Sequence, residues 1–295
     1  MSNHPNLTRR DLLAASLPLL AGTQRAFAKT QRPIGVQLYT VRGTLMKESE
    51  RVIKAIADIG YKEIEGAGRT DLIKLMPLIR QNGMRAVSCH VEVPLVTGDW
   101  DIYGLKPVEL SEAIESVKAI GVQYFTMAYI NPRARGDLDF YRRTAEKMNR
   151  VGQACHKAGL QFVYHNHEFE FGGEPGQRPI DIFKERLDKK LVALELDVFW
   201  VSVAGHDPIA MLKEWKGRVA LLHLKDKGKD QPVQYTEQVD RSAFKEVGSG
   251  SLDFAGLLKA APAAGVKHYF VEQDQTPGDP LESLKKSFDY LSKIG

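Results

Sequence analysis

Eight short apolar segments alternate with helical segments along this chain, and this rhythm constrains the fold more than any other feature. We expect strands at 34–41, 62–65, 85–91, 122–129, 160–167, 192–198, 218–225 and 267–273. The sequence predicts helices at 47–59, 71–81, 107–120, 137–157, 180–187, 208–215, 254–261 and 280–294. Strands joined by single helices run parallel. Eight such units in about 260 residues predict a closed (β/α)8 barrel, the TIM barrel.

An open, doubly wound parallel sheet is the alternative fold for the same rhythm. That fold uses a glycine-rich phosphate turn after its first strand, and no such turn follows 34–41. The composition, 43% hydrophobic and 26% charged, suits a large globular core. We find no boundary after residue 28, so 29–295 is expected to form one catalytic barrel domain.

Residues 1–28 have the pattern of a cleaved export signal. Arg9-Arg10 precede an apolar stretch at 12–21, and Ala26-Phe27-Ala28 ends the segment as an A-x-A cleavage site. The arginine pair resembles a twin-arginine signal, although the basic residue often found after the apolar pair is missing. An uncleaved anchor is the other reading, but the apolar stretch is short for a bilayer. We expect a periplasmic or otherwise exported protein, without stable membrane insertion after cleavage.

Charge and cysteine content exclude several classes of protein. Loss of residues 1–28 removes three arginines and one aspartate, which lowers the formal net charge from +4 to +2. So weak a charge argues against a nucleic-acid partner. Cys89 and Cys155 are too few for a disulfide framework, and we expect both to be buried as small apolar side chains.

Residues that bind metals or move protons stand at the ends of four expected strands. They lie in the segments 164–168, 195–197, 223–226 and 271–274. Buried carboxylates and imidazoles are costly unless paired or bound to a cation. A (β/α)8 barrel gathers its active-site loops at the carboxyl ends of its strands. By period-two alternation, Asp197, His223 and Glu272 are expected to converge there. Their mixed O/N donors suit Mn²⁺, Co²⁺, Zn²⁺ or Mg²⁺, with open positions for substrate oxygens.

Each of these residues also has an ordinary structural explanation. Asp197 could cap the turn after its strand, His223 could be a core histidine, and Glu272 could pair with Lys225. Three such side chains at corresponding strand ends favour the metal site. The same alternation places Glu195 on the face of Asp197, and His165 on the face of His167.

Four blocks of the chain carry a resemblance to a known family: 164–167, 196–200, 223–226 and 247–250. They resemble the xylose-isomerase-like TIM barrels known as sugar phosphate isomerases/epimerases. That family includes inosose dehydratase, hydroxypyruvate isomerase and tagatose 3-epimerase and, more distantly, endonuclease IV. The likeness extends from 35–40 to 270–274. It implies that Asp197, His223 and Glu272 match the metal ligands of the sixth, seventh and eighth strands.

The chain departs from that family pattern at two positions. Family epimerases carry a glutamate on the fifth strand that is both ligand and base, whereas here His165 is expected to complete the metal shell. His167, Glu168 or Glu170 is then the expected base. Where many relatives have a histidine three residues after the sixth-strand aspartate, this chain has Trp200, which could stack on a sugar or simply pack the top of the barrel.

The remaining expected site residues surround this centre. Lys225 is expected to stabilise an oxyanion, or alternatively to neutralise Asp226. The loop 226–252 is the longest in the chain and a candidate lid. The expected substrate contacts are His90, which resembles a family contact, and Trp200, Glu65 and Gln37.

The sequence therefore predicts a metal-dependent isomerase or epimerase that removes a proton next to a carbonyl. No glycine-rich phosphate cradle is evident and an exported enzyme meets few phosphorylated sugars, so we expect a non-phosphorylated sugar or keto-sugar. The alternatives are a dehydratase or lyase acting on a keto-sugar, glycoside or inosose, and a non-catalytic periplasmic sugar-binding protein. The near-neutral charge disfavours a nuclease. The expected partner is a small sugar, and the features also admit a homodimer.

Overall fold

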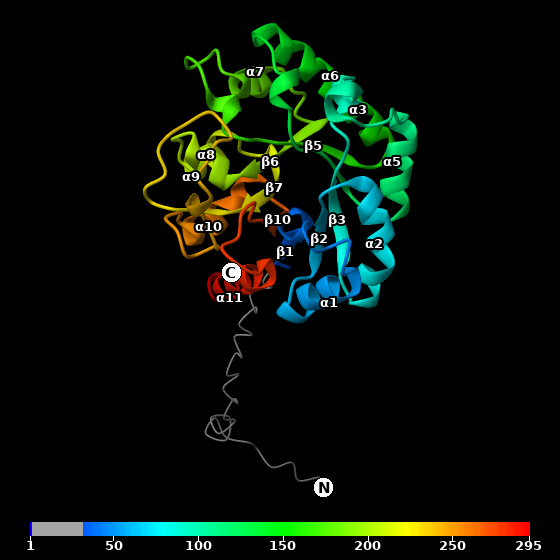
Figure 1. The fold of residues 1–295 in the computed structure, drawn as a ribbon, viewed down its shortest axis with the longest axis vertical. Coiled ribbons are helices and arrows are strands. Elements are labelled where there is room, and N and C mark those ends of the chain that lie inside the picture. Colours follow the sequence, from blue (N-terminus) through cyan, green and yellow to red (C-terminus); the bar gives the residue numbers. More distant parts are fainter. Residues whose placement is uncertain (2–31) are drawn as a thin grey trace. The chain divides into compact units, whose positions relative to one another are not determined.

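The computed structural model describes residues 32–295 together with Met1, and residues 32–295 form one compact unit. Eight parallel strands close into a barrel in the order β1-β10-β7-β6-β5-β4-β3-β2, with the helices around it (Figure 1). The closed α/β barrel predicted from the sequence is therefore confirmed. Its strands are β1 Gly35–Gln37, β2 Glu63–Gly66, β3 Arg85–His90, β4 Tyr124–Met127, β5 Gln161–His165, β6 Val192–Asp197, β7 Val219–Leu224 and β10 His268–Val271.

Each expected helix has a counterpart within a few residues of its predicted bounds. These are α1 Ser49–Ile59, α2 Arg69–Gln81, α5 Leu110–Ala119, α6 Leu138–Ala158, α7 Pro179–Arg186, α9 Pro208–Glu214, α10 Phe254–Ala264 and α11 Pro280–Ile294. Short helices that the sequence did not predict lie in the loops at the carboxyl ends of strands. They are α3 Pro94–Thr97, α4 Trp100–Tyr103, α8 Val198–Val203, and the 3-10 turns η1 Leu38–Val41, η2 Pro132–Ala134, η3 Phe169–Phe171 and η4 Arg241–Ala243.

Several strands end earlier than the sequence predicted, because side chains at their carboxyl ends capture the next backbone amides. Gln37 accepts a hydrogen bond from the Tyr39 amide at 3.1 Å, which turns the chain into η1. Asp197 accepts from the Phe199 and Trp200 amides at 2.9 and 3.1 Å, and so caps α8. These hydrogen bonds hold the side chains of Gln37 and Asp197 at the carboxyl end of the barrel, where the other polar residues lie.

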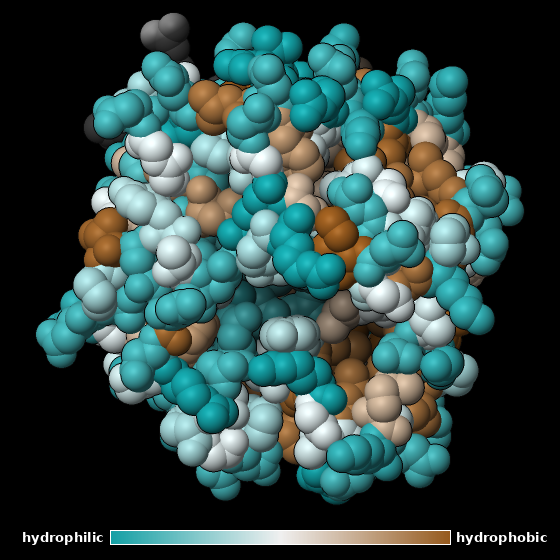
Figure 2. Space-filling view, turned by 45° about the horizontal axis from the view of Figure 1, so that its top comes forward, coloured by the Kyte–Doolittle hydropathy of each residue, from teal (hydrophilic) through white to brown (hydrophobic). Residues whose placement is uncertain are grey.

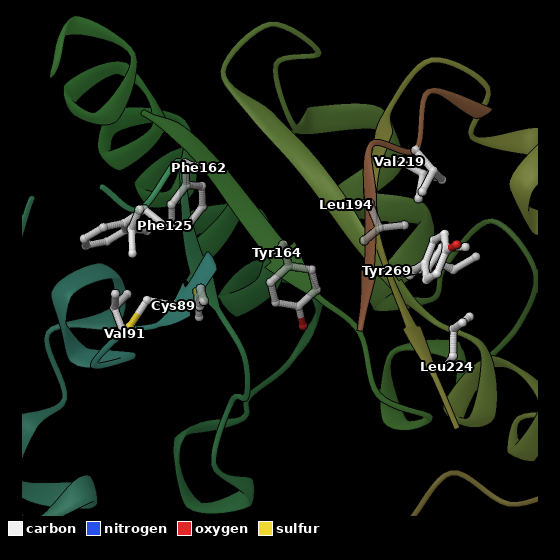
Figure 3. Packing of buried hydrophobic residues seen from close by; sticks show 14 of the residues in the cluster. Cys89, Val91, Phe125, Phe162, Tyr164, Leu194, Val219, Leu224 and Tyr269 are labelled. Atoms are coloured by element: carbon white, nitrogen blue, oxygen red, sulfur yellow. The ribbon is translucent and has the colours of Figure 1, made fainter. Parts of the chain in front are cut away.

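Two separate apolar layers stabilise the barrel. The larger layer lies between strands and helices and includes Phe125, Phe162 and Leu194 (Figure 3). The smaller layer fills the barrel interior and consists of Val87, Val163, Leu221 and Phe270. A Cβ at Gly35 would come within 2.5 Å of the Phe270 ring, so the interior packing requires glycine there. The polar residues of the barrel mouth lie directly above this smaller apolar layer.

The expected lid, 226–252, is closed at its base by a small antiparallel pair, β8 Asp226–Lys227 and β9 Phe244–Lys245. The Asp226 carboxylate accepts hydrogen bonds from five backbone amides, those of Lys227, Gly248, Gly250, Ser251 and Leu252. Asp226 is thus held by backbone amides, and Lys225 forms its ion pairs elsewhere.

In the described part of the chain, no helix combines the length and the apolar run needed to cross a membrane. The export signal predicted over 1–28 lies, apart from Met1, outside the described residues. Cys89 and Cys155 are buried and unpaired, as expected.

Candidate metal centre

Polar and charged side chains fill the barrel above the inner apolar layer. They come from or shortly follow seven strands, and all but His90 and Asp274 are almost fully buried: Gln37, Glu65, His90, His165, Glu195, Asp197, His223, Lys225, Glu272 and Asp274. Figure 2 shows one face of the molecule, hollowed near its middle, with mostly hydrophilic side chains around the hollow. So many buried ionisable groups are stable only as a paired or cation-binding network.

The three residues predicted to converge lie together. The ligand atoms of Asp197, His223 and Glu272 all fall within 4.8 Å of one another. His223 Nδ1 is 2.9 Å from Glu272 Oε2 and 3.8 Å from Asp197 Oδ2. Ligand atoms around one tetrahedral ion with bonds of about 2.0–2.1 Å are separated by ~3.3 Å. The three side chains therefore fit a single divalent cation.

His165, the predicted fourth ligand, lies between this set and a second one. Its Nε2 is 3.7 Å from Asp197 Oδ2, and its Nδ1 is 3.1 Å from Glu195 Oε2. The ligand atoms of His90, His165, Glu195 and His223 also lie within 4.8 Å of one another. We call Asp197, His223 and Glu272 the outer set and these four residues the inner set. The two sets share His223.

Glu65 and Gln37, predicted as substrate contacts, lie in the inner part of this network. Glu65 Oε2 is 2.5 Å from His223 Nε2 and 3.2 Å from His90 Nε2. The Gln37 amide donates to the same oxygen at 2.8 Å. Both Glu65 and Gln37 are fully buried, whereas the His90 side chain keeps 13% of its surface exposed. Of these three residues, His90 is the most exposed to solvent.

Burial, carboxylates and neighbouring histidines shift the pKa values of His223 and His165 in opposite directions. Burial alone would lower the pKa of His223, but Glu195, Glu65 and Glu272 together hold it well above the ordinary value. Burial and the neighbouring His223 lower the pKa of His165 well below its ordinary value. A neutral imidazole is the form that binds a metal. His165 thus has the protonation state of a ligand, whereas His223 has to release a proton when a cation binds.

Lys225 forms a buried ion-pair network with three carboxylates. Its Nζ lies 3.1 Å from Asp197 Oδ2, 2.6 Å from Glu272 Oε2 and 2.8 Å from Asp274 Oδ2. Although burial opposes it, these carboxylates raise the pKa of Lys225 well above its ordinary value. The structure therefore contains the Lys225–Glu272 ion pair, the ordinary structural explanation for Glu272, as well as the cluster of possible ligands.

The three candidate bases after β5 have different surroundings. Glu170 accepts hydrogen bonds from the Tyr164 hydroxyl and, at 2.8 Å, from the His167 amide, and burial raises its pKa to about 8. Tyr164 belongs to the outer apolar layer (Figure 3), so these bonds tie Glu170 to that layer. Glu168 is fully buried, and neither of its oxygens has a hydrogen-bond partner among residues 32–295. Burial raises the pKa of Glu168 to about 7.

The rings of His167 and Trp200 lie close together, tilted by 34° to each other. Their ring centroids are 5.4 Å apart, and the His167 ring is 4.9 Å from that of His165. Trp200 is 4% exposed and packs against Phe199 and Phe244. Its indole nitrogen has no hydrogen-bond partner within the described residues. Packing and sugar contact are both compatible with this position.

Two residues of the network were absent from the predicted site. Glu195 contacts three histidines, and Asp274 holds Lys225. Alternation along β6 placed Glu195 on the face of Asp197, and Asp274 stands two residues after Glu272, so the signal was present in the sequence. What alternation lacks is the depth of each side chain in the barrel.

A closed parallel barrel with carboxylates and imidazoles at its carboxyl end is a (β/α)8 barrel with a candidate metal centre. The chain belongs to the xylose isomerase-like TIM barrel family, whose sequence model matches residues 53–294.

Curated relatives include inosose dehydratases. The chain is 29% identical over 154 residues to that of Geobacillus thermodenitrificans, covering 49% of this chain and 51% of the relative. It is 28% identical over 159 residues to that of Clostridium botulinum, covering 50% and 53%. The chain thus spans about half the length of the curated relatives it matches.

Solved structures share the fold. A sugar phosphate isomerase/epimerase from Parabacteroides distasonis is 22% identical with a TM-score of 0.71, over 89% of this chain and 98% of that one. The IOLI protein, solved with a bound zinc atom, is 17% identical with a TM-score of 0.65, over 89% and 99%. At these identities the likeness establishes the architecture.

Proposed function

We propose that this chain is a metal-dependent enzyme that isomerises or epimerises a non-phosphorylated sugar or keto-sugar by removing a proton next to a carbonyl. The observation that carries the proposal is the convergence of Asp197, His223 and Glu272 within one ligand sphere at the barrel mouth. The zinc bound by the IOLI protein, which has the same fold, supports it.

The outer set and His165 would hold the cation. When bound, Mn²⁺, Co²⁺, Zn²⁺ or Mg²⁺ supplies Lewis-acid polarisation of a carbonyl oxygen. Lys225 faces the same carboxylates, and its ammonium group stabilises negative charge that develops on the substrate oxygen. Asp274 holds Lys225 in place.

Glu168 is the base that the geometry favours among the predicted candidates. Its oxygens accept no hydrogen bond from the described residues, and a pKa of about 7 suits proton transfer at neutral pH. Glu170 has both oxygens occupied, and burial lowers the pKa of His167 well below its ordinary value. Glu168 takes the proton from carbon and returns it, and the Trp200 indole N–H donates to a substrate hydroxyl.

A dehydratase or lyase is the second candidate, favoured by the likeness to inosose dehydratases. It shares the same proton removal, but the proton then goes to a leaving oxygen and water or an aglycone is released. Mass analysis of the products separates this reaction from isomerisation, which leaves the mass unchanged.

The proposed substrate carries no phosphate, which agrees with the proposed export of the chain. Fractionation of cells that produce the full chain tests the export. Comparable turnover of a sugar and its phosphate ester would count against a substrate without phosphate.

The decisive experiment combines elemental analysis with solvent deuterium exchange over ketoses, aldoses and 3-keto glycosides. Asp197→Ala and His223→Ala are each expected to lose both bound metal and exchange. Asp58→Ala, at an exposed carboxylate on α1, is the control and is expected to keep both. Unchanged metal content in both site variants would refute the site. Tight sugar binding without exchange would favour the non-catalytic sugar-binding protein.

A further inference from the structure

Two imidazole rings at the mouth are each enclosed between carboxylates of the outer and inner parts of the network. His223 Nδ1 faces Glu272 at 2.9 Å, while its Nε2 faces Glu65 at 2.5 Å. His165 Nε2 faces Asp197 at 3.7 Å, while its Nδ1 faces Glu195 at 3.1 Å. Each ring thus presents one nitrogen to the outer set and the other nitrogen to a fully buried glutamate of the inner part of the network.

This arrangement bears on which nitrogen carries hydrogen. A neutral imidazole has one N–H donor and one lone pair, and only the lone pair binds a cation. A carboxylate is an acceptor, so when a cation takes up the outer carboxylates, the ring nitrogen that faces a buried inner carboxylate is the one held as N–H. In metal sites, such an acceptor behind a histidine fixes the ring orientation and the tautomer.

We infer that Glu195, acting with Glu65, is a positioning residue for the metal ligands: it holds the inner nitrogens of His165 and His223 as N–H, so that His165 Nε2 and His223 Nδ1 face the cation. The inference rests on the proposed metal site and deepens it. Glu195 is the hub of the inner set, because its Oε2 lies 3.1, 3.3 and 3.4 Å from nitrogens of His165, His90 and His223.

The inner set could itself be considered as a second cation site, since its ligand atoms are equally close together. However, simultaneous occupation of both sets would require His223 to bind metal through both nitrogens, and likewise His165 as the proposed fourth ligand of the outer set. Two rings would then have to lose their second proton and become imidazolates. One cation in the outer set, with the inner carboxylates as acceptors, avoids that cost.

The test is the affinity of the chelator-stripped full chain for Zn²⁺, measured by competition with a chromophoric chelator. Glu195→Gln keeps the shape of the side chain but removes its charge. It is expected to weaken binding about 10–100-fold while one equivalent still binds. Glu63→Gln is the matched control, because Glu63 is a fully buried, inward-facing carboxylate of β2 paired with Arg85 and His268, away from both rings. Its effect on the Zn²⁺ Kd is expected to stay within about twofold.

The outcomes separate this inference from the proposed function. If Asp197→Ala binds Zn²⁺ as the wild type does, the proposed metal site fails. If Asp197→Ala loses Zn²⁺ but Glu195→Gln keeps the wild-type Kd, the positioning role is overturned. A second equivalent in the wild type that disappears in Glu195→Gln would overturn it too.

A measurement on the wild type covers the case in which Glu195→Gln does not fold. Nitrogen-15 NMR of the histidine rings in the Zn²⁺-loaded chain reports the tautomer of each ring. The expected spectrum has N–H at His165 Nδ1 and His223 Nε2, with the other nitrogen of each ring bound to Zn²⁺. The opposite assignment at both rings contradicts the inference.

Discussion

Glu168 combines a burial cost with a proposed catalytic role. Burial raises its pKa from 4.5 to about 7. The folded state therefore binds this proton more tightly than the unfolded state does. The tighter binding contributes to the free energy of unfolding in full below pH 4.5, and the contribution is lost as the pH rises through 7. We expect Glu168→Gln to match the wild type at pH 4.5 and to exceed its stability by up to about 3 kcal/mol at pH 8. Deuterium exchange should fall about 100-fold or more.

Urea unfolding at the two pH values measures the stability part of this prediction. Glu63→Gln provides a control of opposite sign, because hydrogen bonds from His268 and Arg85 lower the pKa of Glu63 despite its burial. That contribution is present above the ordinary pKa and lost as the pH falls, so Glu63→Gln should be less stable than the wild type at pH 8. A Glu168→Gln protein that is also less stable at pH 8 would show that its carboxylate is paired.

Lys225 and the proposed cation compete for the same carboxylates. The ammonium contacts Asp197 and Glu272, which both belong to the outer set. Lys225→Met is therefore expected to bind Zn²⁺ more tightly, by about tenfold, or 1.4 kcal/mol. Exchange should fall about 100-fold, because a charge that stabilises the oxyanion is lost. Chelator competition and deuterium exchange measure the two effects, and weaker Zn²⁺ binding would mean that Lys225 orders the ligands.

At single residues, the sequence could predict the face of a side chain but not its depth. Alternation placed Asp197, His223 and Glu272 inside the barrel, and the structure brings them together. Glu195 shares the face of Asp197 but lies deeper, among the histidines. Depth depends on how neighbouring strands are staggered, and the register between β6 and β7 shifts at Leu194/Glu195. Such a shift leaves no trace in a period-two pattern.

Among the elements, the loop between β8 and β9 is tied to the far side of the mouth. Glu237 accepts hydrogen bonds from the Arg135 guanidinium and, at 3.2 Å, from the Tyr129 hydroxyl. Arg135 in turn lies over the Phe169 ring, 3.3 Å from its centroid. This loop therefore rests on the segment that follows β4, whose Arg135 packs in turn on Phe169 after β5, the arrangement expected of a closed lid.

We expect Glu237→Gln to loosen the lid without affecting the metal site. A partly exposed ion pair is worth up to about 1 kcal/mol, so KM should rise by no more than about fivefold. The loop should also be cut faster in limited proteolysis, while the Zn²⁺ Kd stays the same. Asp230→Asn, at an exposed carboxylate of the same loop, is the control. Equal cleavage rates for the two variants would show that the contacts of Glu237 with Arg135 and Tyr129 do not hold the loop in place.

Helices with one exposed polar face could be predicted from the sequence, whereas a fully buried helix could not. The pattern in 47–59 or 280–294 alternates buried and exposed residues with helical period, and both helices were found. All six residues of α8, by contrast, are buried, so no period marks them as helical. The base of the lid depends on Asp226 binding amides more than 20 residues later in the chain, which local patterns do not reveal.

For the whole molecule, the eightfold rhythm was sufficient to predict the barrel, because parallel strands joined by helices have few other closed arrangements. The same closure links metal binding to global stability. The proposed ligands come from β5, β6, β7 and the end of β10, so a cation connects half of the barrel. A ligand that binds only the folded state stabilises that state by mass action.

At free Zn²⁺ of about 100 times Kd, this linkage is worth about 2.7 kcal/mol. For a barrel of this size, that free energy corresponds to a Tm difference of roughly 5–10 °C between Zn²⁺-loaded and chelator-treated protein. Asp197→Ala lacks one of the proposed ligands and is expected not to bind the cation, so the Tm of that variant should not respond to chelator. Thermal unfolding at several Zn²⁺ concentrations measures both quantities, and the wild-type Tm should rise with the logarithm of free Zn²⁺. An equal response in Asp197→Ala would place the bound metal somewhere other than the barrel mouth.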